Sequence, residues 1–192
     1  MQSQTCLNEK ENRILTVPNL LSLFRICLIP VIVWLYAAEK KSTEAGFVLL
    51  LSGATDLVDG FIARRFRMVS NLGKILDPVA DKLTQGITLI CLLIRFPSMI
   101  LPLILLACKE LFMIVTGAMA IRKTGTVSGA VWHGKIATAL LYAMMLLHIF
   151  WPGIPPVLSA ASACSCSLMI GISFVLYLLR NIRMLRQSTE GR

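Results

Sequence analysis

Apolar stretches about 20 residues long recur along this chain, and no other feature constrains its fold as strongly. An α-helix rises about 1.5 Å per residue, so each stretch can cross a bilayer core of about 30 Å. Hydrophobic residues make up 56% of the 192 residues and charged residues 15%, which leaves too little polar surface for a soluble protein of this size. The sequence therefore predicts a protein embedded in lipid.

Six of these stretches are expected to be membrane-spanning helices. Polar residues interrupt the second, third and fifth of the six, which cover roughly residues 19–38, 46–63, 78–95, 99–121, 131–151 and 156–179. The connections are short and no internal repeat is apparent, which favours a single bundle. The predicted fold class is an all-α integral membrane protein, a bundle of six transmembrane helices.

The bundle is expected to form one domain, residues 18–180, with a segment at each end. Residues 1–17 have polar or charged side chains at each position from 8 to 13 and no apolar core, so a cleavable signal peptide is not expected there. That segment is either a short helix on the membrane surface or an unstructured tail. Residues 181–192 form a basic tail.

Lysine and arginine are distributed unevenly about the six spans. Twelve of them fall on the side that holds both termini, whereas only Lys40, Lys41 and Arg95 fall on the other side. By the positive-inside rule, both termini then lie in the cytoplasm and the protein is a multi-pass protein of the cell membrane. The net charge of +9 serves this topology and contact with anionic lipid headgroups, and nucleic acid is not expected as a partner.

Several residues within the spans are expected to shape or pack helices. Pro30 and Pro102 should kink or locally reshape the first and fourth spans. The six cysteines form no C-x-x-C pair and are expected to act as small apolar residues. The last span has a face for close helix approach, either inside the bundle or across a homodimer seam, made of Ala160, Ala161, Ser162, Ala163, Ser165, Ser167, Gly171 and Ser173.

All four aspartates of the chain lie between positions 56 and 81, at the end of the second span and the start of the third. Asp56 and Asp59 are three residues apart, and Asp77 and Asp81 are four apart. Each pair therefore shares one face of its helix. If the two helices are antiparallel neighbours, four carboxylates converge.

Such a group of carboxylates at the edge of the hydrocarbon needs a positive counter-charge. Each charge costs about 2.5–3.5 kcal/mol on insertion scales, and like charges repel one another. Hard oxygen ligands suit Mg²⁺, Mn²⁺ or Ca²⁺, and carboxylates that hold a divalent ion beside phosphate oxygens are usual in phosphoryl chemistry. Zinc is not favoured, because His133 and His148 lie outside this group and are expected to be packed or interfacial.

The residues around the aspartates fit a nucleotide diphosphate. Gly60 and Ala63 leave a small-walled helix surface, and Arg64 supplies a fork of donors for a diphosphate. Asp77 has an alternative role, because Asp followed by Pro78 is an ordinary helix start with an N-cap and proline at the first helical position. A cap accounts for Asp77 but not for the other three aspartates.

The stretch DLVDGFIARRFRMVSNLGKILDPVAD, residues 56–81, resembles the CDP-alcohol phosphatidyltransferase family. It matches all eight fixed positions, over 26 residues, of that family's pattern D-x2-D-G-x2-A-R-x8-G-x3-D-x3-D. The resemblance implies that Asp56, Asp59 and Asp77 bind a divalent metal, Mg²⁺ or Mn²⁺, and that Asp81 completes the metal group and is the base that deprotonates the acceptor hydroxyl. It also implies a site for the cytidine diphosphate part of the donor made of Asp56, Gly60, Ala63, Arg64 and Gly73.

The opening VPNLLSLFRICLIP is similar to the start of bacterial phosphatidylglycerophosphate synthases and CMP-forming cardiolipin synthases. Asn19 and Arg25 stand where those proteins have an Asn and an Arg. Arg25 lies well inside the first span, where it either snorkels to the interface or faces a polar pocket. The pocket is favoured because an intramembrane Arg is by default functional, which makes Arg25 a candidate for the acceptor site.

Lys109 and Glu110 interrupt the fourth span, and neighbouring residues on a helix diverge, so at most one of them points straight at a site. Phosphatidylglycerophosphate synthases usually have Arg-Glu here and a second Arg about two turns later. This chain has Lys109-Glu110 and no Arg at or beside Gly117, a departure that argues against a phosphorylated acceptor.

Other basic residues could bind the acceptor. Gly134-Lys135 resembles the Gly-Lys at the start of the family's fifth span. Arg122, Lys123 and Lys135 are either ligands of an acceptor phosphate or interfacial anchors, and Lys109 is a further candidate.

The resemblance implies a metal-dependent enzyme that transfers a phosphatidyl group from CDP-diacylglycerol to a small alcohol and releases CMP. Glycerol 3-phosphate is the first candidate acceptor, and phosphatidylglycerol, which would give cardiolipin, is the alternative. A membrane cation transporter is the rival of another class, because intramembrane carboxylates also mark ion pathways. A transporter would spread its acids across the membrane depth, whereas these acids cluster near one boundary.

Overall fold

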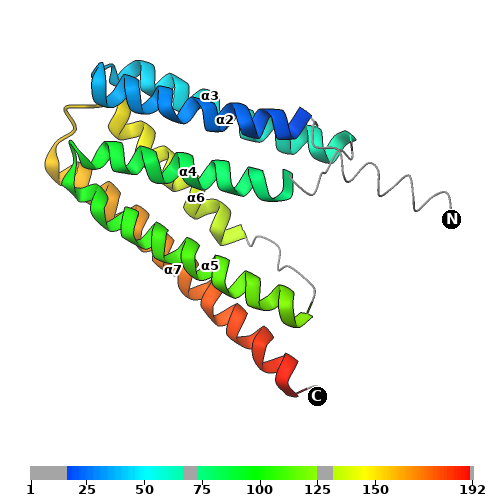
Figure 1. The fold of residues 1–192 in the computed structure, drawn as a ribbon. Coiled ribbons are helices and arrows are strands. Elements are labelled where there is room, and N and C mark those ends of the chain that lie inside the picture. The colour runs from blue at the N-terminus through cyan, green and yellow to red at the C-terminus, as the bar shows by residue number, and fades with distance from the viewer. Residues whose placement is uncertain (1–16, 67–72, 125–131, 191–192) are drawn as a thin grey trace. The chain divides into compact units, whose positions relative to one another are not determined.

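A computed structural model describes residues 17–66, 73–124 and 132–190. Some side chains in these helices lie outside that description, namely those of residues 17–18, 59–64, 66, 74–75, 117–124 and 181–190. The described residues are helical apart from short connections and contain no strand, which confirms the all-helical prediction (Figure 1). The chain divides into two compact units, residues 1–91 and 92–192.

The first unit contains three long helices. They are α2 (Val17–Val33), which continues into the π-helical turn η1 (Trp34–Ala38), then α3 (Ser42–Phe66) and α4 (Gly73–Leu93). Figure 1 shows α2 and α3 lying side by side along their lengths. Between them the chain reverses at Lys40, which has a left-handed backbone with φ of 56°, and the Lys41 N–H donates to the carbonyl of Leu35 at 2.9 Å.

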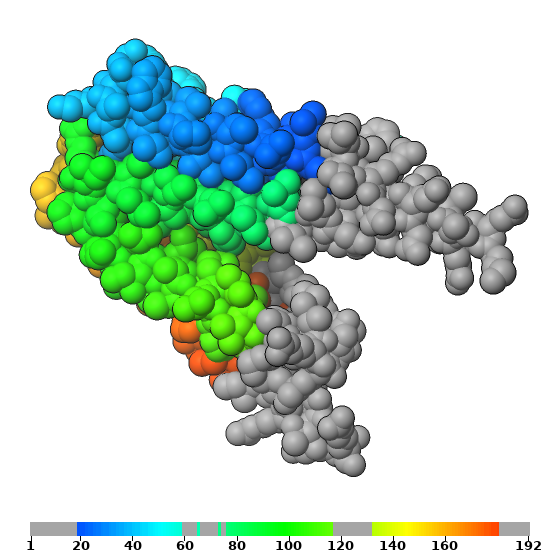
Figure 2. Space-filling view, viewed as in Figure 1, coloured from blue at the N-terminus to red at the C-terminus, as the bar shows by residue number. Residues whose placement is uncertain are grey.

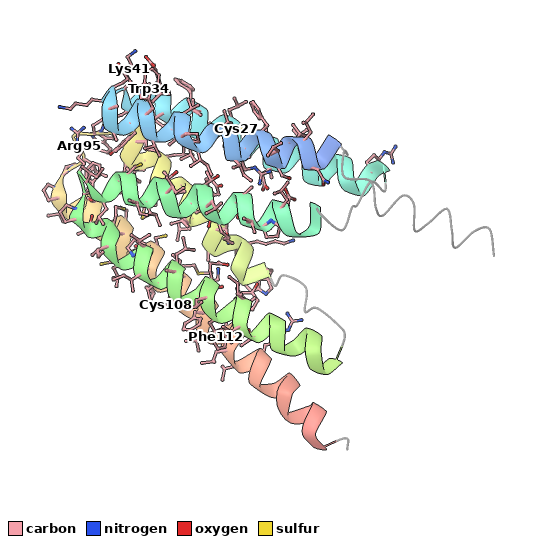
Figure 3. The ribbon with its side chains drawn as sticks, viewed as in Figure 1. Cys27, Trp34, Lys41, Arg95, Cys108 and Phe112 are labelled. Atoms are coloured by element: carbon pink, nitrogen blue, oxygen red, sulfur yellow. The ribbon has the colours of Figure 1, made fainter. Side chains whose placement is uncertain are left out.

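The outer face of α2 and η1 is apolar, as expected of a helix in lipid. It forms a continuous part of the surface in Figure 2. Cys27 and Trp34, both labelled in Figure 3, are exposed, as are Leu20, Leu23 and Phe24.

The interior of the first unit has an apolar part and a polar part. Ile32, Leu49, Ala80 and Leu89 are almost completely buried. Polar side chains from all three helices are also buried, namely Asn19, Ser22, Arg25, Ser52, Thr84, Gln85 and Thr88. Buried polar groups need hydrogen-bond partners, so this polar part is where a site is expected.

The second unit contains a short 3-10 turn, η2 (Pro97–Met99), and the helices α5 (Ile100–Thr124), α6 (Trp132–Phe150) and α7 (Pro156–Glu190). Figure 1 shows α7 beside α5, and α7 also packs against α6. The rings of Phe112, labelled in Figure 3, and Phe174 meet edge to face with centroids 5.2 Å apart. At Gly134 a Cβ atom would come within 2.7 Å of the Tyr177 hydroxyl oxygen, so any larger residue would require the Tyr177 side chain to shift.

Both histidines are packed inside the second unit, as expected. His148 is completely buried: its Nδ1 lies 2.8 Å from the Met144 carbonyl and its Nε2 lies 3.0 Å from Ser159 Oγ. His133 Nδ1 lies 3.3 Å from Ser173 Oγ, and its ring meets that of Tyr177 with centroids 4.9 Å apart.

Four helical segments among the described residues are long and apolar enough to cross a membrane. They are Asn19–Ala38, Pro97–Thr116, Trp132–Phe150 and Pro156–Arg180, which correspond to the first, fourth, fifth and sixth predicted spans. The second and third predicted spans are also helices, α3 and α4, but they are more polar than these four segments and do not meet the same limits on hydropathy and charged residues.

One detail of the predicted helices is wrong. The helix that contains Asp77 and Pro78 begins at Gly73, so Asp77 is not its N-cap and Pro78 lies inside it. Pro102 is the third residue of α5, in the first turn, where a backbone N–H has no partner within the helix. It therefore removes no hydrogen bond of that helix and is not expected to kink it.

Of the small side chains of α7, those of Ala163, Ser167 and Ser173 are buried, whereas those of Ala160, Ala161 and Ser165 are exposed. Five cysteines, from Cys27 to Cys166, are free, and Cys6 lies outside the described residues.

Candidate active site

Arg25 of α2 lies at the centre of the polar part of the first unit. Its side chain is 0% exposed, and its Nη1 lies 2.6 Å from Oδ1 of Asp56 on α3. Its Nη2 lies 3.7 Å from Oδ1 of Asp77 on α4. One guanidinium from the first helix therefore joins an acid of each of the two sequence pairs. The prediction that Arg25 faces inward is confirmed.

Ser22 adds a second contact between α2 and α4. Its hydroxyl donates to Oδ1 of Asp77 at 2.8 Å, and the residue is 1% exposed. Ser22 and Arg25 are three residues apart, so they share one face of α2. Asp77 is thus held by two side chains of a helix more than 50 residues earlier in the chain.

Asp81 lies one turn after Asp77 on α4 and has contacts within its own helix. The Gln85 amide Nε2 donates to Oδ2 of Asp81 at 2.9 Å, and the Lys82 Nζ lies 3.8 Å from the same oxygen. Asp56 interacts electrostatically with both Asp77 and Asp81. Arg25 therefore links Asp56 and Asp77, and Asp81 lies one turn further along α4.

The exposure of these acids matters for ligand access. The side chain of Asp56 is 41% exposed, that of Asp77 39% and that of Asp81 19%, whereas Arg25 beneath them is fully buried. The acids therefore form the accessible side of the site, and Arg25 lies on its buried side.

The donor chemistry of these residues fits a hard divalent cation. Carboxylate oxygens are the ligands that Mg²⁺ and Mn²⁺ prefer, and each carboxylate can accept several contacts. Arg25 contacts Oδ1 of Asp56 and Oδ1 of Asp77, and Ser22 also donates to Oδ1 of Asp77. The described side chains alone do not form a group of three metal ligands, and the fourth acid, Asp59, has its side chain outside the description.

Several predicted ligands of the site cannot be placed beyond their helix. The side chains of Asp59, Gly60, Ala63 and Arg64 on α3 and of Arg122 on α5 lie outside the described residues, as does Lys123. Gly73, predicted to contact the nucleotide, is the first residue of α4.

Two basic residues predicted for the acceptor lie in the second unit. Lys109 on α5 is 5% exposed, and its Nζ lies 3.1 Å from Oε1 of Glu110. Although neighbouring residues on a helix diverge, these two long side chains meet. Lys135, near the start of α6, is exposed.

Sequence reasoning missed Ser22 and Gln85. Their spacing carried a signal, because Ser22 is three residues before Arg25 and Gln85 is four residues after Asp81. Residues at these spacings share a helix face, so polar residues there are candidates to support a charged neighbour.

Residues 15–180 match the family model of the CDP-alcohol phosphatidyltransferases. The chain belongs to the CDP-alcohol phosphatidyltransferase family. The match includes the motif that contains Asp56 and Asp77, the two acids that Arg25 contacts. Members of this family generally depend on a divalent metal.

Relatives of this chain include proteins named for two different acceptors. The chain is 38% identical over 144 residues to a CMP-forming cardiolipin synthase of Streptomyces coelicolor, covering 71% of this chain and 66% of that protein. It is 29% identical over 177 residues to a CDP-diacylglycerol–glycerol-3-phosphate 3-phosphatidyltransferase of Aquifex aeolicus, covering 89% and 98%.

A third relative is a fusion protein of Schizosaccharomyces pombe named as a CMP-forming cardiolipin synthase and mitochondrial hydrolase. It is 45% identical over 86 residues, which cover 45% of this chain and 14% of the fusion protein. The chain thus spans slightly under two thirds of the Streptomyces protein and a small part of the fusion protein.

Proposed function

We propose that this chain transfers a phosphatidyl group from CDP-diacylglycerol to a small alcohol and releases CMP. The single observation that carries the proposal is that the buried Arg25 contacts Asp56 of α3 and Asp77 of α4, two acids from separate helices. These acids belong to the motif of a family of phosphatidyltransferases.

In this proposal, residues 18–180 form one domain in which six helices cross the cell membrane, with both termini in the cytoplasm. Residues 1–17 and 181–192 are cytoplasmic segments. The polarity of α3 and α4 supports this arrangement, because helices that line a polar cavity tolerate acids that lipid-facing helices do not.

Mg²⁺ or Mn²⁺ would be held chiefly by Asp56, Asp59 and Asp77, with Asp81 beside it, and when bound it would supply positive charge against the donor's diphosphate. Arg25 keeps Asp56 and Asp77 turned toward one another, since it contacts both. Gly60, Ala63, Arg64 and Gly73 would line the cytidine diphosphate, with the Arg64 guanidinium available to the phosphate oxygens.

Asp81 is proposed as the base. Its carboxylate takes the proton of the acceptor hydroxyl as that oxygen attacks the lipid-side phosphorus. A new bond forms between the acceptor oxygen and this phosphorus, and the bond from the phosphorus to the CMP oxygen breaks. CMP leaves with the electron pair of that bond, and the acyl chains of the donor stay in the bilayer.

Glycerol 3-phosphate is the proposed acceptor. A relative named for this acceptor aligns with the chain over 98% of its own length. Arg25, Lys109, Arg122 and Lys135 are the candidate residues for the acceptor, and Lys135 is exposed at the start of α6.

Phosphatidylglycerol is the second candidate acceptor, because Lys109 is buried and paired with Glu110. A lysine already neutralised by a neighbour attracts an acceptor phosphate less strongly. A homodimer remains a further proposal, supported only by the exposed small residues of α7, such as Ala160 and Ala161.

The experiment that tests the proposal supplies the purified protein in lipid nanodiscs with CDP-diacylglycerol and Mg²⁺. Glycerol 3-phosphate, phosphatidylglycerol, inositol phosphate and serine are added one at a time, and CMP release is measured. We expect release that depends strictly on one acceptor. Failure to release CMP with any acceptor, together with cation flux through liposomes that contain the protein, would favour the transporter.

A further inference from the structure

Gln85 is completely buried on α4, one helical turn beyond Asp81. Its Nε2 donates to Oδ2 of Asp81 at 2.9 Å. An ionised carboxylate only accepts hydrogen bonds, so the NH₂ end of the amide must face Asp81 and the carbonyl end must face away. The contact therefore fixes the orientation of both groups.

This orientation leaves the other end of the amide without support. Oε1 of Gln85 is buried and has no hydrogen-bond partner within the part of the chain that the structure describes. A buried acceptor without a partner destabilises a fold, whereas an apolar side chain of the same length at this position would not. The amide is therefore poorly suited to stabilising the fold. Its hydrogen bond to Asp81 is the one interaction that an apolar residue at this position could not make.

We propose that Gln85 is a positioning residue for the transfer reaction, an inference that rests on the proposed function. A carboxylate at the end of a short side chain rotates over a broad range of χ2. By bonding Oδ2, the Gln85 amide restricts this rotation and presents the Asp81 carboxylate to the acceptor hydroxyl in one orientation. Its one hydrogen bond among the described residues is to Asp81, so it would act through that carboxylate.

The expected effect falls on turnover. A displacement of about 1 Å at a reacting group can cost about 100-fold in rate, because proton transfer needs aligned atoms. The proposed donor site consists of Asp56 and the nucleotide-binding residues of α3, whereas the hydrogen bond of Gln85 is to Asp81 on α4. Loss of the amide should therefore lower kcat and leave the KM for CDP-diacylglycerol nearly unchanged.

The test compares two variants of Gln85 with a control. Gln85→Met keeps the length and removes both polar atoms, and Gln85→Glu keeps the shape but loses the donor. Ser167→Ala is the control: Ser167, in the second unit, is also buried, its Oγ also has no partner among the described residues, and it has no bond to a carboxylate. For each variant, kcat, the KM for CDP-diacylglycerol and the Tm are measured in nanodiscs.

We expect kcat to fall about 10- to 100-fold in Gln85→Met and in Gln85→Glu, with KM within about twofold of wild type. The Tm of Gln85→Met should equal or exceed that of wild type, because an orphaned acceptor is removed. Ser167→Ala should keep the wild-type kcat. A stabilising role for Gln85 predicts the opposite, a lower Tm with kcat per folded molecule unchanged.

Wild-type kcat in both Gln85 variants would overturn the inference, as would a fall in kcat that follows a fall in Tm. If the wild-type protein releases no CMP with any acceptor, the proposed function itself fails, and the inference falls with it. The two failures are distinguished by the wild-type measurement.

Discussion

The two units of this protein bury polar side chains in different ways. In the first unit, Arg25, Ser22 and Gln85 all bond carboxylates of one motif, and those carboxylates are partly exposed. In the second unit, the polar groups around His148 bond one another. His148 donates from Nδ1 to the Met144 carbonyl, its Nε2 pairs with Ser159, and Ser159 pairs with Ser98 at 2.8 Å.

The difference indicates a division of labour. A closed chain of hydrogen bonds satisfies its own members and stabilises packing, whereas side chains that hold exposed acids prepare them for a ligand. The helices α5, α6 and α7, like α2 of the first unit, are long and apolar enough to span a membrane, whereas α3 and α4 are more polar. We therefore expect substitutions in the first unit to reduce activity most and those in the second unit to reduce stability most.

The largest effect is expected for the aspartates of α3 and α4. Asp81→Asn should lower kcat about 10²- to 10⁴-fold, because it removes a general base. It should keep Mn²⁺ and CDP-diacylglycerol binding better than Asp56→Asn, which loses a metal ligand. Turnover and binding are measured for each variant. Equal loss of binding in the two would refute the separate roles of base and ligand.

Arg25→Met should lower the free energy of unfolding by about 2 kcal/mol. Breaking a fully buried ion pair costs about 3–5 kcal/mol, and the value is smaller here because Asp56 and Asp77 are more than a third exposed. It should also lower activity, since both acids lose the group that orients them. Denaturation in detergent micelles measures the change, with exposed Arg65→Met as the control. Equal stability of the two variants would contradict the role given to Arg25.

Ser159→Ala should lower the free energy of unfolding by about 1–2 kcal/mol and leave kcat unchanged. The substitution removes the partner of His148 Nε2, a buried ring atom. Ser165→Ala, on the same helix but exposed, should have almost no effect. A large loss of kcat in folded Ser159→Ala would contradict the assignment of activity to the first unit and stability to the second.

Lys40→Gly should raise the free energy of unfolding by about 0.5–1 kcal/mol. Lys40 has φ of 56°, a left-handed backbone that glycine adopts at no steric cost. Lys41→Gly is the matched control and should destabilise the protein. Lys41 does not have a positive φ, so glycine relieves no backbone strain there and loses more conformational entropy on folding. The same denaturation assay compares them, and a destabilised Lys40→Gly would show that the turn has other requirements.

The sequence predicted the helices well where the signal is local. Long apolar stretches correspond to α2, α5, α6 and α7 because length and composition alone decide whether a helix suits a membrane. The start of α4 was missed because Asp77-Pro78 has the pattern of a helix start, yet helical backbone begins one turn earlier at Gly73. Proline near a helix start is tolerated at more than one position, so the pattern alone cannot fix the boundary.

The candidate site was predictable only in part. The spacing of the aspartates predicted that each pair shares one face of its helix. The position of Arg25 inside an apolar span predicted that its side chain faces inward. The pairing of Arg25 with Asp56 and Asp77 depends on how α2 lies against α3 and α4, which no local pattern encodes. Ser22 bonds Asp77 across 55 positions for the same reason. Roles carried over from the family, including those of Asp59 and Arg64, remain predictions.

Binding of Mn²⁺ to the purified protein, followed by the EPR signal of free Mn²⁺, tests the central claim that the acids of α3 and α4 act as one site. The account predicts one tight site, weakened about tenfold or more in Asp56→Asn, Asp59→Asn and Asp77→Asn. Glu44→Gln, which changes an exposed acid at the other end of α3, should bind as wild type does. Unchanged Mn²⁺ affinity in all three aspartate variants would contradict the account.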